Sequence, residues 1–199
     1  MYKEVLEYTV SFFSETHVGT GLAIPGQADA LVARDRDGVP YLPEGTIKGM
    51  VRDGAERLMG FLGSDESDPL IMTIFGKSQQ KEGGICSFLP ADPAIGLGET
   101  ELRYGNRVDP LLGCVAGDFF YSRELLPIHA NFSGKIFSTR DLDVDEKIFL
   151  KLSFKMVESF GARRTRGDGT CLILFGQEEP TFEQTKGWLT KKQKEKSME

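Results

Sequence analysis

The chain has 199 residues, of which 40% are hydrophobic and 27% are charged, and its formal net charge at pH 7 is −6. These proportions are typical of one globular domain and exclude a wholly disordered chain or a coiled coil. No apolar run is long enough to cross a membrane and the N-terminus does not resemble a signal peptide, so we expect a cytoplasmic protein with no membrane partner.

The first predicted element is a strand over residues 2–13. Its apolar residues alternate with polar ones, as in a half-buried strand: Leu6, Tyr8, Val10 and Phe12. Residues 14–45 lose this pattern and are rich in glycine, proline and charge. A loop of this length is more often functional than a simple connection.

A helix is predicted next, with Thr46 as its N-cap and its last apolar residue at Leu62. Gly49 and Gly54 weaken this helix by about 1 kcal/mol each relative to alanine, so we expect close packing or backbone contact there. Residues 85–89 form a short second strand, and residues 91–125 alternate so little that we expect a second long, irregular insertion.

The third strand is predicted over residues 126–137, and His129 alternates with the residues of its buried face. Residues 143–160 then begin with the spacing of a capping box at Asp143 and Glu146 and end before Gly161. Their apolar residues also alternate, so a strand is the alternative, but the cap and the terminal glycine favour a helix. A buried strand follows at residues 170–175, and the lysine-rich residues 177–199 are expected to be a polar, flexible tail.

These elements have the order β-α-β-β-α-β. This order is typical of the ferredoxin-like α+β fold, in which two helices cover one face of an antiparallel sheet. The predicted domain spans residues 1–176, with insertions at about 14–45 and 91–125.

The sequence GARRTRGDG, from Gly161 to Gly169, is a basic loop on an otherwise acidic protein. Its glycines can adopt positive φ and present backbone N–H groups, and its arginines can donate pairs of hydrogen bonds to phosphates. The loop follows a helix and precedes a strand, the reverse of a dinucleotide-binding motif. We therefore predict a polyanion site, against the alternative of an ordinary helix end with surface arginines. The residues expected to bind are Gly161, Arg163, Arg164, Arg166, Gly167 and Gly169.

Two further groups are candidate RNA contacts. Lys48 and Arg52 share one helix face and either extend the same basic surface or are simply solvated. Arg103 and Arg107 lie among aromatic residues, a mixture that suits single-stranded nucleic acid, although a small satellite core is the alternative.

The remaining reactive side chains indicate little chemistry on their own. The three cysteines are far apart and have no CxxC pair, so we expect small buried residues rather than a zinc site or disulfides. His17 lies in the first insertion and is expected to be a hydrogen-bonded anchor, with general-base catalysis as the alternative.

Several of these segments together resemble the RAMP superfamily. LPEGTIKGMVR at Leu42 to Arg52 is similar to its helix start, and GARRTRGDG to its glycine-rich loop, although Asp168 stands where an aromatic residue is common. IFG at Ile74 to Gly76, SFLPAD at Ser87 to Asp92 and GNRVDPLLGCVAGDFFYSRELLP at Gly105 to Pro127 follow in the order typical of backbone subunits of type III CRISPR effectors.

This resemblance implies a subunit that binds CRISPR guide RNA, meets target RNA and assembles with other subunits of a type III complex. It also implies that residues 91–125 form a thumb-like hairpin that pushes between guide and target. By the same pattern, Asp29 matches an aspartate that cleaves target RNA with a divalent cation, expected to be Mg²⁺. A carboxylate that holds a hydrated divalent cation can stabilise the charge that develops during RNA cleavage. The alternative is a non-catalytic RNA-binding or capping subunit, in which Asp29 only shapes its loop. A guide-processing nuclease, which usually has two such domains in a longer chain, is a less favoured alternative.

Overall fold

The computed structural model describes residues 2–19, 28–77, 83–94, 96–108 and 111–197 of the chain. Its main sheet has the strand order β2 (Cys86–Phe88), β6 (Asn131–Ser138), β1 (Lys3–Phe12) and β7 (Cys171–Leu174), and each strand is antiparallel to its neighbours. The short β3 (Asp92–Pro93) also pairs with β6. The second, third, first and fourth predicted strands therefore lie side by side, and the predicted ferredoxin-like fold is confirmed.

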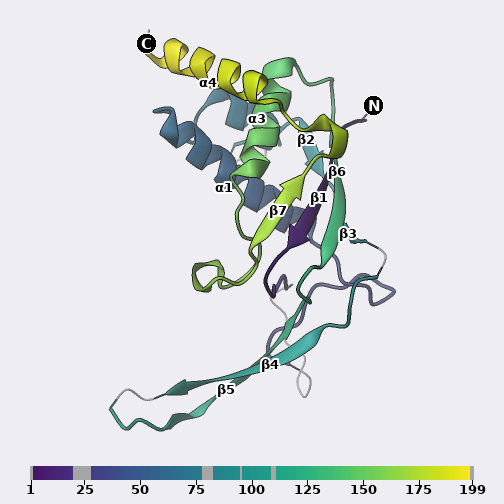
Figure 1. Ribbon diagram of the computed structural model, residues 1–199, viewed down its shortest axis with the longest axis vertical. Helices are drawn as coiled ribbons and strands as arrows, with labels where there is room; N and C mark the ends of the chain where they lie inside the picture. Colours follow the sequence, from purple (N-terminus) through teal and green to yellow (C-terminus); the bar gives the residue numbers. More distant parts are fainter. Residues whose placement is uncertain (1, 20–27, 78–82, 95, 109–110, 198–199) are drawn as a thin grey trace.

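The helices lie on one side of this sheet (Figure 1). α1 (Glu44–Phe61) and α3 (Val144–Lys155) pack against each other, with the short α2 (Pro69–Phe75) beside them. A side chain on Gly54 would place its Cβ 2.3 Å from the Ser153 carbonyl oxygen, so the expected close packing at this glycine is confirmed. At Gly49 no described atom lies within 4 Å of an added Cβ, so the same expectation was wrong there. The alternating residues of β1 face the helices, and the Tyr8 ring lies 4.7 Å from that of Phe154.

The ends of both helices differ in part from those predicted. Pro43 is the N-cap of α1, so Thr46 lies inside the helix rather than before it. The capping box at the start of α3 is confirmed, but the helix ends at Lys155 and not at residue 160. Residues 158–160 leave the helix because their backbone pairs with the start of β7, where the Cys171 N–H donates to the Glu158 carbonyl.

The second insertion is a hairpin of β4 (Glu101–Val108) and β5 (Val115–Leu125), which projects away from the body of the molecule (Figure 1). The expectation of an irregular segment was wrong, and the expectation of a hairpin is confirmed. Period-two alternation is weak because the hairpin buries no continuous face: Tyr104 and Phe120 stack on each other in the open, with ring centroids 5.5 Å apart. β5 extends to Leu125, and β6 begins at Asn131, five residues later than the predicted start of the third strand.

His129 therefore lies in a turn rather than in a strand. It is exposed and has a φ of +67°, so the prediction that it belongs to the third strand was wrong. The three cysteines differ in their burial. Cys86 and Cys171 are buried, and burial raises the pKa of their thiols to about 11 and about 12. Cys114 is exposed between the hairpin strands, which contradicts the expectation that all three are buried.

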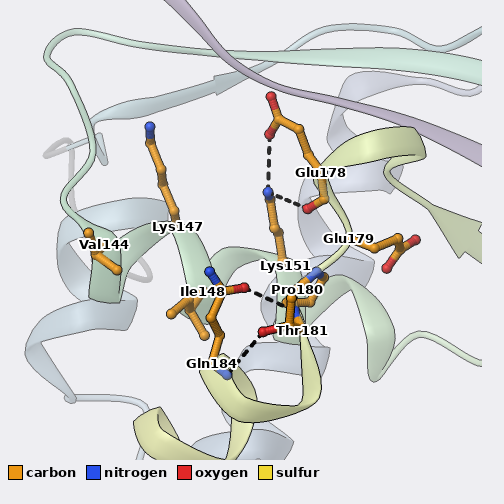
Figure 2. Close-up of a pocket in the computed structure, with 9 residues that line it drawn as sticks. All are labelled: Val144, Lys147, Ile148, Lys151, Glu178, Glu179, Pro180, Thr181 and Gln184. Atoms are coloured by element: carbon orange, nitrogen blue, oxygen red, sulfur yellow. Dashed lines mark hydrogen bonds and ion pairs between the residues drawn. The ribbon is translucent and has the colours of Figure 1, made fainter.

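The C-terminal residues form a helix, α4 (Phe182–Ser197), where the sequence predicts a flexible tail. Thr181 and Gln184 cap it reciprocally, with bonds of 2.9 and 3.2 Å between the backbone N–H of each residue and the side chain of the other. Figure 2 shows this cap at one side of a hollow of about 500 Å³ between α3 and α4. At its other side, the Lys151 ammonium donates to both the carbonyl and the carboxylate of Glu178.

The outer edge of β7 is occupied by side chains of the same chain. The Lys155 ammonium donates to the Ile173 carbonyl at 2.7 Å, and the Phe175 N–H donates to the Glu179 carboxylate at 2.9 Å. Lys155 and Glu179 also form an ion pair at 2.9 Å, which holds both groups against the strand.

Candidate nucleic-acid interface

The glycine-rich loop joins α3 to β7 at the same end of the sheet from which the hairpin projects (Figure 1). Gly161, Gly167 and Gly169 have φ values of +91°, +87° and +76°, which confirms the predicted positive φ at all three. A Cβ on Gly169 would lie 1.9 Å from the Phe160 carbonyl oxygen. Two backbone hydrogen bonds hold Gly169 in place: the Phe160 N–H donates to the Gly169 carbonyl, and the Gly169 N–H donates to the Glu15 carbonyl. Glycine is therefore required at the base of the loop by both its φ and its close contact.

The arginines of this loop differ in how far they reach into solvent. Arg164 and Arg166 form one turn of 3-10 helix and are exposed, and the Arg164 guanidinium lies 3.9 Å from Asp53 of α1. Arg163 is half-buried, has a φ of +60° and lies 3.4 Å from the Tyr121 hydroxyl of β5. The loop thus presents two arginines outward, while the third points toward the hairpin.

The segment after β1 runs beneath the loop. The Ser14 hydroxyl donates to the Gly167 carbonyl and accepts from the Thr170 N–H, both at 2.9 Å. The His17 carbonyl accepts from the Ala162 N–H, and its Nδ1 lies 2.8 Å from the Glu124 carbonyl oxygen. This ring is packed against the backbone of Gly19, which has no room for a Cβ. These contacts place His17 as an anchor between the loop and β5, as expected.

Asp29 is exposed, and its carboxylate is held by Ser122 of β5. Its Oδ2 accepts from the Ser122 N–H at 2.6 Å and from the Ser122 hydroxyl at 3.1 Å. The Asp29 N–H donates in turn to the Ser122 carbonyl at 3.1 Å, and Ala30 forms a parallel bridge with Arg123. The carboxylate is therefore fixed in place at the root of the hairpin and faces solvent.

The described residues offer a divalent cation only a partial site. In the ranges that the structure covers, no three acidic, histidine or cysteine side chains gather as metal ligands. One fixed, exposed carboxylate fits a mostly hydrated Mg²⁺ ion, because this ion keeps several waters and is commonly held by one or two carboxylates together with substrate phosphates. Asp29 is thus compatible with the predicted cation if RNA supplies the remaining ligands.

Arg123 is one of the residues of this region that the sequence did not single out, together with Ser122 and Glu124. It is buried, and its Nη1 forms an ion pair of 2.7 Å with Asp168 of the glycine-rich loop. Among the described atoms its Nε has no hydrogen-bond partner. The one feature of the sequence that could have indicated Arg123 was Asp168. This acidic residue lies in a loop otherwise suited to polyanions, so it needs a positively charged partner.

Glu124, the next residue, points to the first insertion. Its carboxylate accepts from the Val32 N–H at 3.0 Å and from the Thr100 hydroxyl at 2.6 Å, and it pairs with the Arg34 guanidinium. Burial alone would raise the pKa of Glu124, but the hydrogen bonds from Thr100, Arg34 and Val32 together hold it below the ordinary value. The carboxylate is therefore charged at neutral pH and fastens the insertion to β5.

The hairpin carries the second group of predicted contacts. Arg103 lies on β4, where it forms an ion pair with Glu15, and remains half-exposed. Arg107 also lies on β4, but its side chain is outside the part of the chain that the structure describes, as is that of Phe119. Tyr121 lies flat on Gly105, at whose position a Cβ would be 2.4 Å from the tyrosine ring.

The structure places Lys48 and Arg52 away from the glycine-rich loop. Lys48 borders a hollow beside Cys86 and Phe88 of β2. Arg52 donates to Glu56 at 2.7 Å and to the Gly76 carbonyl at 3.0 Å, where it caps the end of α2. Their role as RNA contacts stays a prediction.

Comparison with known proteins agrees with this geometry. The family model of the RAMP superfamily matches residues 9–171, and the chain belongs to this superfamily. No curated protein matches the sequence significantly. The fold resembles a chain in the cryo-EM structure of Type III-B Cmr-beta in the apo state, with a TM-score of 0.68 and 12% identity over 89% of this chain and 98% of that one. A chain of Type III-B Cmr-beta bound to cognate target RNA gives the same TM-score and identity over 87% and 96%. Because only 12% of the residues are identical, this similarity supports the fold and not a particular role.

One further property concerns membranes. Across the helices of the described ranges, none combines the length and the apolar character that a membrane span requires.

Proposed function

We propose that this chain is a backbone subunit of a type III CRISPR effector complex, which binds guide RNA through its glycine-rich loop and assembles with other subunits in the cytoplasm. The observation that carries the proposal is the loop on a RAMP fold, with Arg164 and Arg166 exposed above glycines that hold positive φ. A strand of phosphates suits this arrangement, because guanidinium groups and backbone N–H groups both bind phosphate oxygens.

The net charge of −6 is compatible with this function. A subunit that contacts RNA along one groove needs positive charge only there, and the loop supplies it locally. Because the guide is recognised through its backbone and shape, the subunit would read no target sequence by itself.

We further propose that Asp29 takes part in cleaving complementary target RNA. Its fixed, exposed carboxylate at the root of the hairpin supports this role, because the hairpin is where guide and target are expected to separate. A divalent cation, expected to be Mg²⁺, would supply charge stabilisation at the phosphate, and Asp29 with RNA phosphates would hold it. The alternative is a non-catalytic RNA-binding or capping subunit. The bonds between Asp29 and Ser122 favour neither alternative, since they also fit a carboxylate that shapes its loop.

The guide-binding proposal is tested by purifying the chain with its native neighbours and sizing any RNA that accompanies it. A discrete small RNA supports the proposal, and preparations without RNA contradict it. Replacing Arg163, Arg164 and Arg166 by alanine should then strip the guide. For single strands, each lost phosphate contact lowers the log-log salt slope of binding by about 0.7, so the slope should fall by about 2 in the triple variant.

A lysine at the opposite end of β1 provides the matched control. Lys3 pairs with Asp141 and lies far along the strand from the loop, so Lys3→Ala should change neither the salt slope nor the RNA content. If the triple variant also keeps the wild-type slope while it remains folded, the loop is an ordinary helix end.

A further inference from the structure

Three consecutive residues at the root of β5 each contact a different part of the molecule. Ser122 holds Asp29, Arg123 pairs with Asp168 in the glycine-rich loop, and Glu124 fastens the rest of the first insertion. Because side chains alternate along a strand, those of Ser122 and Glu124 lie on one face of β5 and that of Arg123 lies on the other. All three contacts are therefore made within one residue of Arg123. The loop that we propose binds the guide is thereby tied to the hairpin that is expected to meet the target.

Of these three contacts, the ion pair between Arg123 and Asp168 is the one that joins the glycine-rich loop to β5. Both side chains are largely shielded from solvent, at 10% and 18% exposure. An aspartate between Gly167 and Gly169 would repel phosphate if its charge were free. Arg123 neutralises that charge and turns it into an attachment between the loop and the hairpin.

We infer that Arg123 is a positioning residue, which holds the glycine-rich loop and the β4–β5 hairpin in one fixed geometry so that a single RNA strand contacts both. This inference rests on the proposed RNA-binding function. Two sites held at a fixed spacing bind a strand that reaches both of them far more tightly than either site alone, because the second contact becomes intramolecular. Loosening the pair would remove that gain without removing either site.

The test measures affinity for oligouridylates of about 4 to about 16 nucleotides, the range that single-strand binding domains occupy. In the full wild-type chain, affinity should rise steeply once the strand is long enough to reach both surfaces. In Asp168→Asn, which leaves no free negative charge in the loop, short strands should bind at least as tightly as in the wild type, while the longest should bind about ten- to a hundredfold more weakly. Arg123→Met should lose the same gain for long strands, and its freed Asp168 charge should also weaken the short ones. Arg123→Lys keeps the charge and should recover part of the gain.

Two controls separate positioning from folding. Arg140→Met removes the partner of the buried Glu146 carboxylate, which contacts neither the glycine-rich loop nor the hairpin in the described contacts, and it should lower stability without altering the dependence on RNA length. The double variant Arg123→Met/Asp168→Leu leaves no unpaired buried charge, so its melting temperature should exceed that of either single variant. It should nevertheless still lack the gain for long RNA.

A readout without RNA makes the outcome independent of the proposed function. In the free chain, Asp168→Asn should speed hydrogen exchange at the amides of residues 161–169 and 121–124 and leave β6 unchanged. A retained gain for long RNA, an equal loss for short and long RNA, or unchanged exchange would each overturn the inference. A further outcome is that the wild-type chain binds no RNA of any length while the exchange results are as expected. In that case Arg123 still holds the loop and the hairpin together, and the proposed RNA-binding function fails.

Discussion

The indole of Trp188 in α4 stacks on the ring of Phe149 in α3, with ring centroids 5.9 Å apart and planes inclined by 25°. Trp188 is 2% exposed and is the one buried residue among those described in α4, and Leu189 beside it is partly buried against the core. The ion pair between Lys191 and Asp145 adds a second contact on the same side. The C-terminal helix is therefore fastened to the domain mainly through one side chain.

Replacing this tryptophan tests that attachment. Trp188→Ala should release α4 and cost about 3 to 5 kcal/mol of stability, the range for losing a buried tryptophan. Limited proteolysis and thermal unfolding measure the effect. Phe182, on the same helix, is 74% exposed, so Phe182→Ala should change neither measurement. Resistance of α4 to protease in the tryptophan variant would contradict this account.

The glycines of the basic loop should differ in their tolerance of a methyl group. Gly169→Ala forces a Cβ to within 1.9 Å of the Phe160 carbonyl oxygen, so it should open the base of the loop and weaken RNA binding. At Gly167 the same φ strain applies, but no atom lies within 4 Å of the added Cβ. Gly167→Ala should therefore cost only about 1 to 2 kcal/mol, the strain of a left-handed residue. Equal unfolding free energies for the two variants would show that the close contact is relieved elsewhere.

Acid should weaken the domain through two glutamates. The Arg140 hydrogen bond lowers the pKa of Glu146, and the network around Glu124 lowers the pKa of that residue, each from an ordinary value of 4.5. A carboxyl whose pKa is lower in the folded state stabilises the protein above its unfolded pKa and loses this contribution as the pH falls through the folded one. Melting temperature should thus be level near neutrality and fall below about pH 4.5. Glu124→Gln should lower stability at neutral pH and reduce this dependence on acid.

The role of Asp29 can be separated from its loop contacts. In the assembled complex, Asp29→Asn removes the charge but keeps an oxygen that can accept from the Ser122 N–H, so guide RNA should be retained while target cleavage falls by about a hundredfold or more. Ser122→Ala removes only the hydroxyl bond and should have a smaller effect. Removal of divalent ions with a chelator should reproduce the asparagine variant. Wild-type cleavage by Asp29→Asn would favour the non-catalytic subunit.

Local patterns predicted the elements that bury one continuous face. The alternation of β1 and the capping box of α3 both follow from a few neighbouring residues, and both are present in the structure. The hairpin strands expose both faces, so they lack the alternation by which a strand is found. For α4, a lysine-rich composition concealed a helix whose docking depends mainly on Trp188.

The contacts at the candidate interface join residues that are distant in sequence. Asp29 meets Ser122 across 93 residues, and Arg123 meets Asp168 across 45. Neither pair has a local signature, since each depends on where the hairpin root lies relative to the sheet. The positive φ of the loop glycines was predictable because glycine spacing alone indicates it, but the partner of Asp168 was not.

The blocked strand β7 also limits how copies of this chain can meet. An open sheet edge lets identical proteins join strand to strand, which leads to uncontrolled polymers and aggregates. Here the outward carbonyl of Ile173 is taken by Lys155, and the N–H of Phe175 by Glu179. A second copy of this chain would therefore find these backbone groups occupied, and it could approach this edge only through side chains.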